Sequence, residues 1–101
     1  MNRTIHPEAK IEYQDAFAYF ENEQAGLGDV FSEQIEAALR NICAFPFACV
    51  ELEPGIRRHV VRKFKYGIIY SVDKEGISIL SFAHFRRKPV YWKQRLNQIT
   101  Q

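Results

Sequence analysis

The chain has few of the features that mark several common protein classes. Cys43 and Cys49 are too few for a disulfide scaffold, which favours a reducing compartment. No apolar run approaches the roughly 18 residues that a membrane-spanning helix needs. The N-terminal residues 1–7 lack the hydrophobic core of a secretory signal peptide. We therefore expect a cytoplasmic protein that does not associate with a membrane.

Motifs for several kinds of chemistry are also missing. The three histidines and two cysteines do not have the paired spacing of metal ligands, so we expect no metal site. The segment 26–28, Gly-Leu-Gly, lacks the third glycine and the preceding strand of a phosphate-binding loop. The carboxylate pairs Glu8/Glu12 and Glu33/Glu36 fall at helix-surface spacing, where we expect exposed, solubilising acids. The sequence therefore predicts no metal and no other cofactor.

What the chain does have is enough apolar and aromatic residues, 47% and 14%, to pack a core. Its 101 residues correspond to a single domain, residues 1–101. The charge is unevenly distributed. Residues 1–54 contain three Lys/Arg and ten Asp/Glu, a net charge of −7, whereas residues 55–101 contain eleven and two, a net charge of +9. This asymmetry predicts an acidic or nucleic-acid partner for the C-terminal half.

The N-terminal half predicts a strand followed by two helices. A short strand is expected at about residues 2–6, where a His-Pro pair ends it. From Ala9 to Phe20, apolar residues recur at steps of three and four, which predicts a helix over about residues 8–24. After a glycine turn, Asp29 can cap a second helix, whose apolar period continues to Pro46. Two such helices form a hairpin that must cover a flat apolar surface.

The C-terminal half predicts that surface. After an expected loop at residues 46–55, β-branched and aromatic residues predict strands at about 56–64, 66–73 and 76–85. The short connections favour an antiparallel meander. A short helix is expected at about residues 90–98. The predicted fold class is α+β: a short N-terminal strand, an α-helical hairpin packed on an antiparallel three- to four-stranded sheet, and a short C-terminal helix.

Basic residues, interleaved with aromatic residues in the second and third of these segments, gather at 57–59, 62–66 and 84–93. Cations neutralise phosphates or carboxylates, and aromatic faces can stack on bases. The alternative is a solvated sheet face on which Lys and Arg stems cover apolar surface. Self-repulsion among like charges favours an anionic partner over that alternative.

Two residues in the last of these segments are candidates for proton transfer. The imidazole of His84 can move protons near neutral pH. The hydroxyl of Tyr91, beside several cations, can act as an acid or a base. Alternatively, His84 makes ordinary hydrogen bonds at the end of a strand, and Tyr91 packs the final helix onto the sheet.

Four segments in their order resemble the RelE/ParE superfamily of bacterial type II toxins, and more closely its ParE branch. They are His6-Pro7-Glu8-Ala9, Gly26-Leu27-Gly28-Asp29-Val30-Phe31, Tyr66-Gly67-Ile68-Ile69-Tyr70-Ser71-Val72 and Ala83-His84-Phe85-Arg86-Arg87-Lys88-Pro89-Val90-Tyr91-Trp92. The resemblance implies a strand, a helical hairpin and an antiparallel sheet. It also implies a toxin, of a kind linked to plasmid stabilisation, that a cognate antitoxin holds inactive by wrapping it with a C-terminal segment.

The resemblance leaves the target of the toxin open. RelE-type members cut mRNA in the ribosomal A site, whereas ParE-type members inhibit DNA gyrase. Basic and tyrosine positions of the RelE pattern are matched by Arg58 and Tyr91, with Arg62 nearby. Two further RelE arginines fall at Gly67 and near Phe85, and losing such donors weakens stabilisation of the transition state. The match therefore favours a gyrase inhibitor without chemistry of its own.

Three hypotheses follow for the function: a gyrase inhibitor, a ribosome-dependent mRNA endoribonuclease, and a non-toxic basic binding module on the same fold. For the nuclease, the candidate catalytic residues are Arg58, Arg62, His84, Arg87 and Tyr91. The residues expected to contact the target or the antitoxin are Arg57, Arg58, Arg62, Arg86, Arg87, Lys88, Tyr91 and Lys93. Because this surface is cationic and aromatic, we expect an antitoxin with acidic and apolar residues in its C-terminal segment.

Overall fold

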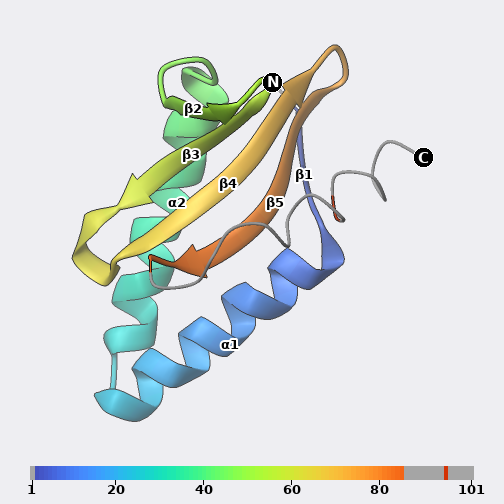
Figure 1. Cartoon of the computed structure of the whole chain (residues 1–101). Coiled ribbons are helices and arrows are strands. Elements are labelled where there is room, and N and C mark those ends of the chain that lie inside the picture. Colours follow the sequence, from blue (N-terminus) through green and yellow to red (C-terminus); the bar gives the residue numbers. More distant parts are fainter. Residues whose placement is uncertain (1, 86–94, 96–101) are drawn as a thin grey trace.

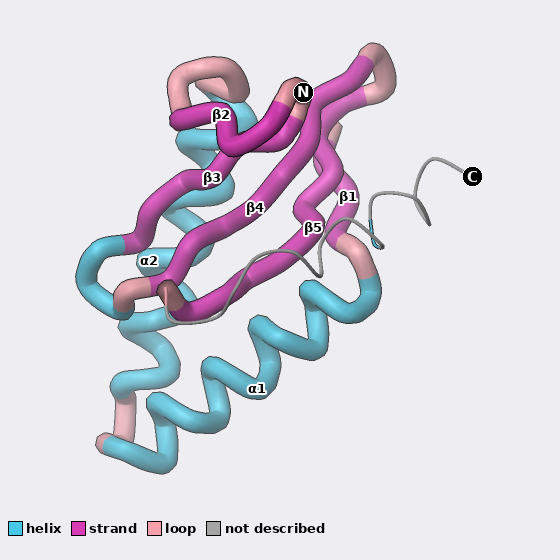
Figure 2. Tube along the Cα trace, viewed as in Figure 1, coloured by secondary structure: helices cyan, strands magenta, loops and turns pink. Residues whose placement is uncertain are grey.

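A computed structural model describes residues 2–85 and residue 95, which form two layers (Figure 1). A five-stranded sheet forms one layer, and two helices cover one of its faces (Figure 2). In chain order, the elements are β1 (Arg3–Ile5), α1 (Pro7–Glu23), α2 (Leu27–Ala44), β2 (Val50–Glu53), β3 (Ile56–Val61), a 3-10 turn (Arg62–Phe64), β4 (Tyr66–Asp73) and β5 (Gly76–His84). The expected α+β class, with a helical hairpin on a sheet, is confirmed.

The strands lie in the order β1-β5-β4-β3-β2. From β2 to β5 they form the expected antiparallel meander. The first strand differs from the prediction of an antiparallel sheet, because β1 pairs with β5 in parallel, with Arg3 opposite Ile77 and Ile5 opposite Ile79. The whole helical hairpin and three strands lie between β1 and β5 in the sequence, and a connection of this length allows a parallel pair. The sheet is therefore mixed.

The expected loop at residues 46–55 is wrong in its second half, where β2 lies. Val50 pairs with Arg58, and Glu51 pairs with Arg57, so β2 is an edge strand next to β3. Val50 is 70% exposed, so this strand buries little apolar surface of its own. Pairing with β3 is what makes it a strand, and a sequence pattern does not contain that information. The sheet therefore has five strands, not three or four.

The first long strand also ends earlier than the predicted residue 64. Strand β3 ends at Val61, and a 3-10 turn takes its place over Arg62–Phe64. Lys65 then adopts a left-handed conformation, with a φ of 57°. This turn buries Phe64 in the core while Arg62 remains exposed.

The helical hairpin begins almost where predicted, but its second helix is capped differently. Helix α1 starts at Pro7, and the backbone N–H of Glu8 donates to Nδ1 of His6 over 3.1 Å. Helix α2 starts at Leu27, so the expected cap by Asp29 is wrong. The carboxylate of Glu21 replaces it, accepting from the backbone N–H groups of Gly26 and Gly28 at 2.9 and 3.0 Å. A left-handed Gly26, with a φ of 88°, turns the chain tightly enough for Glu21 to reach these groups.

The main core lies between the helices and the sheet. Its largest buried side chains come from α2 and from strands β4 and β5, and aromatic rings fill the end near the hairpin turn. Ring centroids of Phe20 and Phe64 lie 4.7 Å apart, and those of Phe31 and Tyr66 lie 5.4 Å apart. A smaller cluster of Ile56, Ile69 and Leu80, with Leu52 beside it, lies on the opposite face.

Strand β5 contains one more residue than the stretch of β4 that it pairs with. Ile69 pairs with Ser81 and Tyr70 pairs with Ile79, so Leu80 has no opposite residue. This β-bulge shifts the alternation of side chains along the strand. Ile79 before it and Phe82 after it both pack in the main core. The bulge thus determines which side chains near the end of β5 face helix α1.

The expected C-terminal helix at residues 90–98 lies outside the described residues, apart from Arg95. Among the helices that are described, none is long and apolar enough to span a membrane.

Candidate functional site

The face of the sheet opposite the helices contains an open concavity of about 510 Å³, lined by Arg58, Val60, Arg62 and Phe85. Alternation along β3 places Arg58 and Val60 on this face. Arg62 comes from the 3-10 turn that follows, and Phe85 comes directly after β5. Val60 and Phe85 are 38% and 47% exposed. The concavity is therefore lined by two partly exposed apolar side chains and two arginines.

Gly67 on β4 determines how Arg58 lies in this concavity. A Cβ atom on residue 67 would be 2.9 Å from Cδ of Arg58, so the arginine stem occupies the space above the glycine. The guanidinium carbon lies 6.0 Å from the centroid of the Phe85 ring, within cation–π range. The glycine therefore lets a charged side chain lie flat on the sheet.

Positive charge gathers at this end of the sheet. Arg58, Arg62, Lys63 and Lys65 are all exposed. None of them has a carboxylate within ion-pair distance among the residues that the structure describes. Because like charges repel, such a cluster favours an anionic partner. This agrees with the predicted cationic sheet.

Arg57, another predicted binding residue, faces away from this concavity. Its guanidinium donates to the backbone carbonyls of Phe47 and Cys49, at 3.1 and 2.8 Å. It also pairs with Glu51 at 3.2 Å and lies 5.4 Å from the centre of the Phe47 ring. These contacts hold the segment before β2 against β3, so the side chain has a clear structural role.

His84 lies on the helix side of the sheet. It is opposite Tyr66 in the β4–β5 pair, and their ring centroids are 5.6 Å apart at an angle of 88°. Tyr66 packs against Phe31 of the main core, which places His84 near the same layer. His84 lines two hollows of about 290 and 310 Å³ next to α1, where Tyr19 also lies.

The structure therefore brings together only part of the predicted catalytic set. Arg58 and Arg62 share one concavity, whereas His84 lines hollows on the other face. Outside the described residues lie Arg86, Arg87, Lys88, Tyr91 and Lys93.

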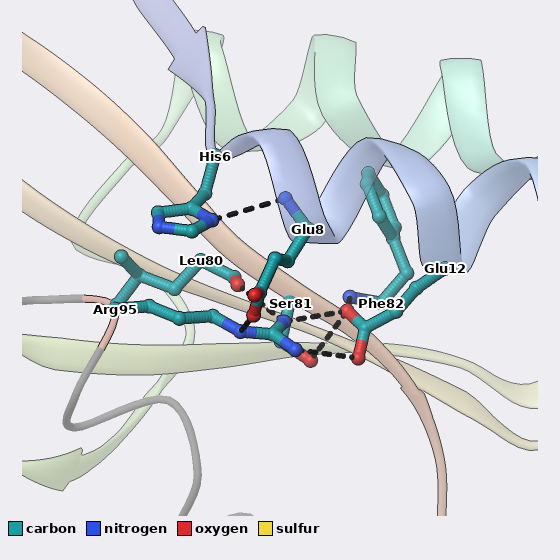
Figure 3. A network of polar contacts seen from close by, with 7 residues as sticks. All are labelled: His6, Glu8, Glu12, Leu80, Ser81, Phe82 and Arg95. Carbon is teal, nitrogen blue, oxygen red and sulfur yellow. Dashed lines mark hydrogen bonds and ion pairs between the residues drawn. The ribbon is translucent and has the colours of Figure 1, made fainter. Parts of the chain in front are cut away.

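A second site, which the sequence did not predict, is a buried polar network at the edge of β5 (Figure 3). Strand β1 pairs with β5 only as far as Ile79, so the backbone beyond it lacks a strand partner on that side. Glu12 of α1 reaches this edge. One of its carboxylate oxygens accepts from the backbone N–H of Phe82 at 3.1 Å and from the hydroxyl of Ser81 at 3.2 Å. Glu12 thus acts as the hydrogen-bond acceptor that a neighbouring strand would supply.

Arg95 completes this network. Its Nη1 lies 2.7 Å from Oε1 of Glu12, and its Nη2 lies 3.2 Å from Oε2, a bidentate contact. Nη1 also donates to the carbonyl of Leu80 at 3.0 Å, and Nε lies 3.3 Å from a carboxylate oxygen of Glu8. Arg95 is only 6% exposed. Glu12 and Arg95 together therefore satisfy the free edge of β5 with one acceptor and one donor.

The expectation that Glu12 is an exposed acid is wrong, since its side chain is only 11% exposed. A signal was present in the sequence. Ala9 and Ala16 flank Glu12 at helical spacing and are 0% and 4% exposed, so α1 comes close to the sheet on this face. A carboxylate between two small residues of a buried stripe indicates a partner in the core. That partner, Arg95, is 83 residues away, and spacing alone does not identify it.

A third group of titratable side chains lies near β2. Sγ of Cys49 and Nδ1 of His59 are 3.3 Å apart, and burial lowers the pKa of His59. The hydroxyl of Tyr70 donates to the carbonyl of Pro46 at 2.9 Å. Burial, followed by the nearby Cys49 thiol, raises the pKa of Tyr70 above its usual value. The lowered pKa of His59 and the raised pKa of Tyr70 keep both side chains neutral at neutral pH, which suits a packing role.

Within residues 2–85 and 95, no three His, Cys, Asp or Glu side chains gather closely enough to hold a metal ion.

Comparison with known proteins identifies the family. A search of curated proteins gave no match. A family model described as the ParE toxin of the type II toxin–antitoxin system parDE matches residues 4–89, which include both helices, strands β2 to β5 and the lining of the concavity. The match covers most of the chain, and the fold agrees with the one that the resemblance implied. The chain belongs to the ParE toxin family of type II toxin–antitoxin systems, in which the partner of the toxin is an antitoxin.

Proposed function

We propose that this toxin acts by binding DNA gyrase and inhibiting it, and that a cognate antitoxin neutralises it. The observation that carries the proposal is the concavity in which Arg58 and Arg62 flank the apolar side chains of Val60 and Phe85. Neither arginine has a carboxylate partner in the described part of the chain. Two guanidinium groups next to exposed apolar side chains suit an acidic protein surface.

The lining of the concavity supports binding over RNA cleavage. Attack by a ribose 2′-hydroxyl requires a base for the hydroxyl proton and an acid for the leaving oxygen. The described lining consists of two arginines, whose side chains have no acceptor atom, together with a valine and a phenylalanine. His84, the candidate imidazole for proton transfer, lines hollows next to α1 instead.

The same surface suits the antitoxin. A C-terminal antitoxin segment with acidic and apolar residues would complement both the guanidinium groups and the exposed Phe85. An antitoxin that covers Arg58 and Arg62 would block the target by occupying its binding site. The proposed target implies that the toxin acts in the cytoplasm.

The test compares two activities of the purified toxin after its antitoxin has been removed. One assay measures inhibition of DNA supercoiling by gyrase, and the other measures mRNA cleavage in the A site of programmed ribosomes. The proposal predicts inhibited supercoiling and intact mRNA. Cut mRNA with normal supercoiling would instead support the endoribonuclease. Neither effect, with no growth arrest on expression, would support a non-toxic binding module.

A further inference from the structure

The connection between β3 and β4, residues 62–65, is held in one conformation at the end of the sheet (Figure 1). Phe64 is 8% exposed, and its ring centroid lies 4.7 Å from that of Phe20. The backbone N–H of Lys65 donates to the carbonyl of Arg62 at 3.2 Å. We call these four residues the basic turn, because the three side chains other than that of Phe64 are exposed cations.

Lys65 ends the basic turn in a left-handed backbone conformation, with a φ of 57° and a ψ of 40°. A residue with a Cβ atom is strained in this conformation, so glycine and asparagine are the usual residues there. At the other described positions with a positive φ the chain has glycine, namely Gly26, Gly55 and Gly76. Lys65 is therefore the one described residue that places a charged side chain where the backbone favours glycine.

The backbone of Lys65 is bonded directly to the lining of the concavity. Its carbonyl accepts from the N–H of Phe85 at 2.9 Å, and Phe85 lines the concavity. Arg62, at the start of the basic turn, lines it as well. Lys65 thus brings a further exposed cation to the border of the concavity, and no carboxylate in the described part of the chain pairs with it.

The apolar side chains of the concavity indicate which kind of partner this cation meets. Phosphates of a nucleic-acid duplex would pair with the cations but would leave Val60 and Phe85 uncovered. An acidic protein surface can cover these apolar side chains and pair with the cations at the same time. The lining therefore favours a protein carboxylate as the partner of Lys65.

We propose that Lys65 is a further target-binding residue, whose ammonium group contacts an acidic side chain of gyrase at the border of the concavity. The inference rests on the proposed function, since it takes gyrase as the partner. It explains why a lysine lies where the backbone favours glycine, because strain in the folded chain is offset by affinity for the partner. Since the backbone of the basic turn is already fixed, only the lysine side chain loses freedom on binding.

The first test measures gyrase inhibition by variants of the full chain that separate the charge from the backbone. Lys65→Asn and Lys65→Gly remove the charge and suit the left-handed conformation. We expect each to raise the concentration for half-inhibition of supercoiling about fivefold. Lys65→Arg keeps the charge and should change this concentration less than about twofold. Normal inhibition by both uncharged variants would overturn the proposal.

Lys74→Asn is the matched control. Lys65 precedes β4 and Lys74 follows it, so the two lysines lie at opposite ends of one strand. Lys74 is exposed and, like Lys65, pairs with no carboxylate among the described residues. Its replacement should change half-inhibition less than about twofold. An equal loss in Lys65→Asn and Lys74→Asn would overturn the proposal, because net charge alone would then explain it.

Urea denaturation tests whether weaker inhibition comes from loss of folded protein. Because glycine relieves the strain of the left-handed conformation, the denaturation midpoint of Lys65→Gly should be at least as high as that of wild type. A lower midpoint together with weaker inhibition would overturn the proposal, since the lysine would then stabilise the fold itself.

Fluorescence anisotropy with a labelled DNA duplex tests the other class of partner without gyrase. We expect no binding at toxin concentrations that inhibit supercoiling. Binding that weakens about fivefold in Lys65→Asn would overturn the protein carboxylate in favour of a phosphate backbone. A wild-type toxin that leaves supercoiling unaffected would overturn the proposed function and this inference together. Equal inhibition by wild type and by the uncharged variants would overturn the inference alone.

Discussion

Arg58 lies across Gly67, with its Cδ atom 2.9 Å from the point that a Cβ atom on residue 67 would occupy. This contact places the guanidinium over the ring of Phe85. The RelE pattern has an arginine at the position of Gly67, and here an arginine from the neighbouring strand covers that position. The large side chain of Arg58 on β3 thus fills the space that Gly67 on β4, which has no side chain, leaves open, and this pair shapes the concavity.

Gly67→Ala should displace Arg58 and leave the fold intact. The added methyl group crowds the arginine stem, which can rotate away into solvent. Because alanine also restricts the unfolded chain, the free energy of unfolding should change by no more than about 1 kcal/mol. Urea denaturation checks this value.

In the supercoiling assay, the same variant should inhibit gyrase several-fold less well than wild type. Ser71→Ala, on the same strand and the same face, is the matched control and should inhibit normally. Full inhibition by Gly67→Ala would mean that the position of Arg58 does not matter for the target.

Reversing the charge of the concavity should abolish partner binding without destabilising the protein. Arg58→Glu and Arg62→Glu together replace two exposed cations that have no carboxylate partner in the described chain. We expect affinity for the antitoxin, for gyrase, or for both to fall about a hundredfold or more, because acidic residues would then face acids. Isothermal titration calorimetry measures the affinity for the antitoxin, and the supercoiling assay reports the loss of gyrase binding.

Arg40→Glu is the control for this charge reversal. It makes the same change at an exposed position of α2 that also lacks an ion pair within the described residues. It should leave both affinities nearly unchanged. If Arg40→Glu weakened binding as much as the double substitution, the effect would come from the net charge of the protein and not from the concavity.

Local periodicity in the sequence was enough to predict most of the fold. Both helices follow from apolar spacing, because each buries one stripe, and the three long strands follow from runs of β-branched and aromatic residues, which in β4 and β5 are buried on both faces. Strand β2 does not, since Val50 is exposed and its pairing with Arg58 depends on residues that lie further along the chain. The parallel pairing of β1 is missed for the same reason. Both errors concern edge strands, where partners and not side-chain burial determine the structure.

The site was predicted less completely than the fold. Charge counting found the cationic region that includes Arg58 and Arg62, because Lys and Arg outnumber Asp and Glu in residues 55–101. It could not separate them from Arg57, which contacts Glu51 and two carbonyls. The helix-surface spacing of Glu8 and Glu12 led to the wrong prediction that Glu12 is exposed. Which residue a buried charge contacts depends on long-range pairing, and a single sequence does not contain that information.

Glu21→Ala should destabilise the protein through the turn between the helices. The Glu21 carboxylate accepts from two backbone N–H groups at the start of α2, those of Gly26 and Gly28. Loss of a helix cap costs about 1 kcal/mol, so urea denaturation should give a decrease of that size. Glu23→Ala, an exposed acid on the same helix, is the control and should change stability by less than about 0.5 kcal/mol. Equal effects would show that helix propensity, and not the cap, is being measured.

The stability of the protein should fall in mild acid because of His59. Burial lowers the pKa of this imidazole, which also contacts the Cys49 thiol. Below the pKa of about 6.5 in the unfolded chain, the unfolded state binds a proton that the folded state resists, so the free energy of unfolding decreases as the pH falls. One such proton contributes at most about 1.4 kcal/mol per pH unit.

His59→Asn isolates this contribution, because asparagine does not titrate and its amide can still meet Cys49. Urea denaturation of both proteins between pH 7.5 and pH 5 provides the measurement. Wild type should lose more stability over this range than the variant, and the two curves should run parallel above pH 7, where His59 is neutral in both states. Since His6 and His84 are present in both proteins, their contributions cancel in the difference. Parallel curves down to pH 5 would mean that the folded protein accepts a proton on His59 as readily as the unfolded chain does, in contradiction to its burial.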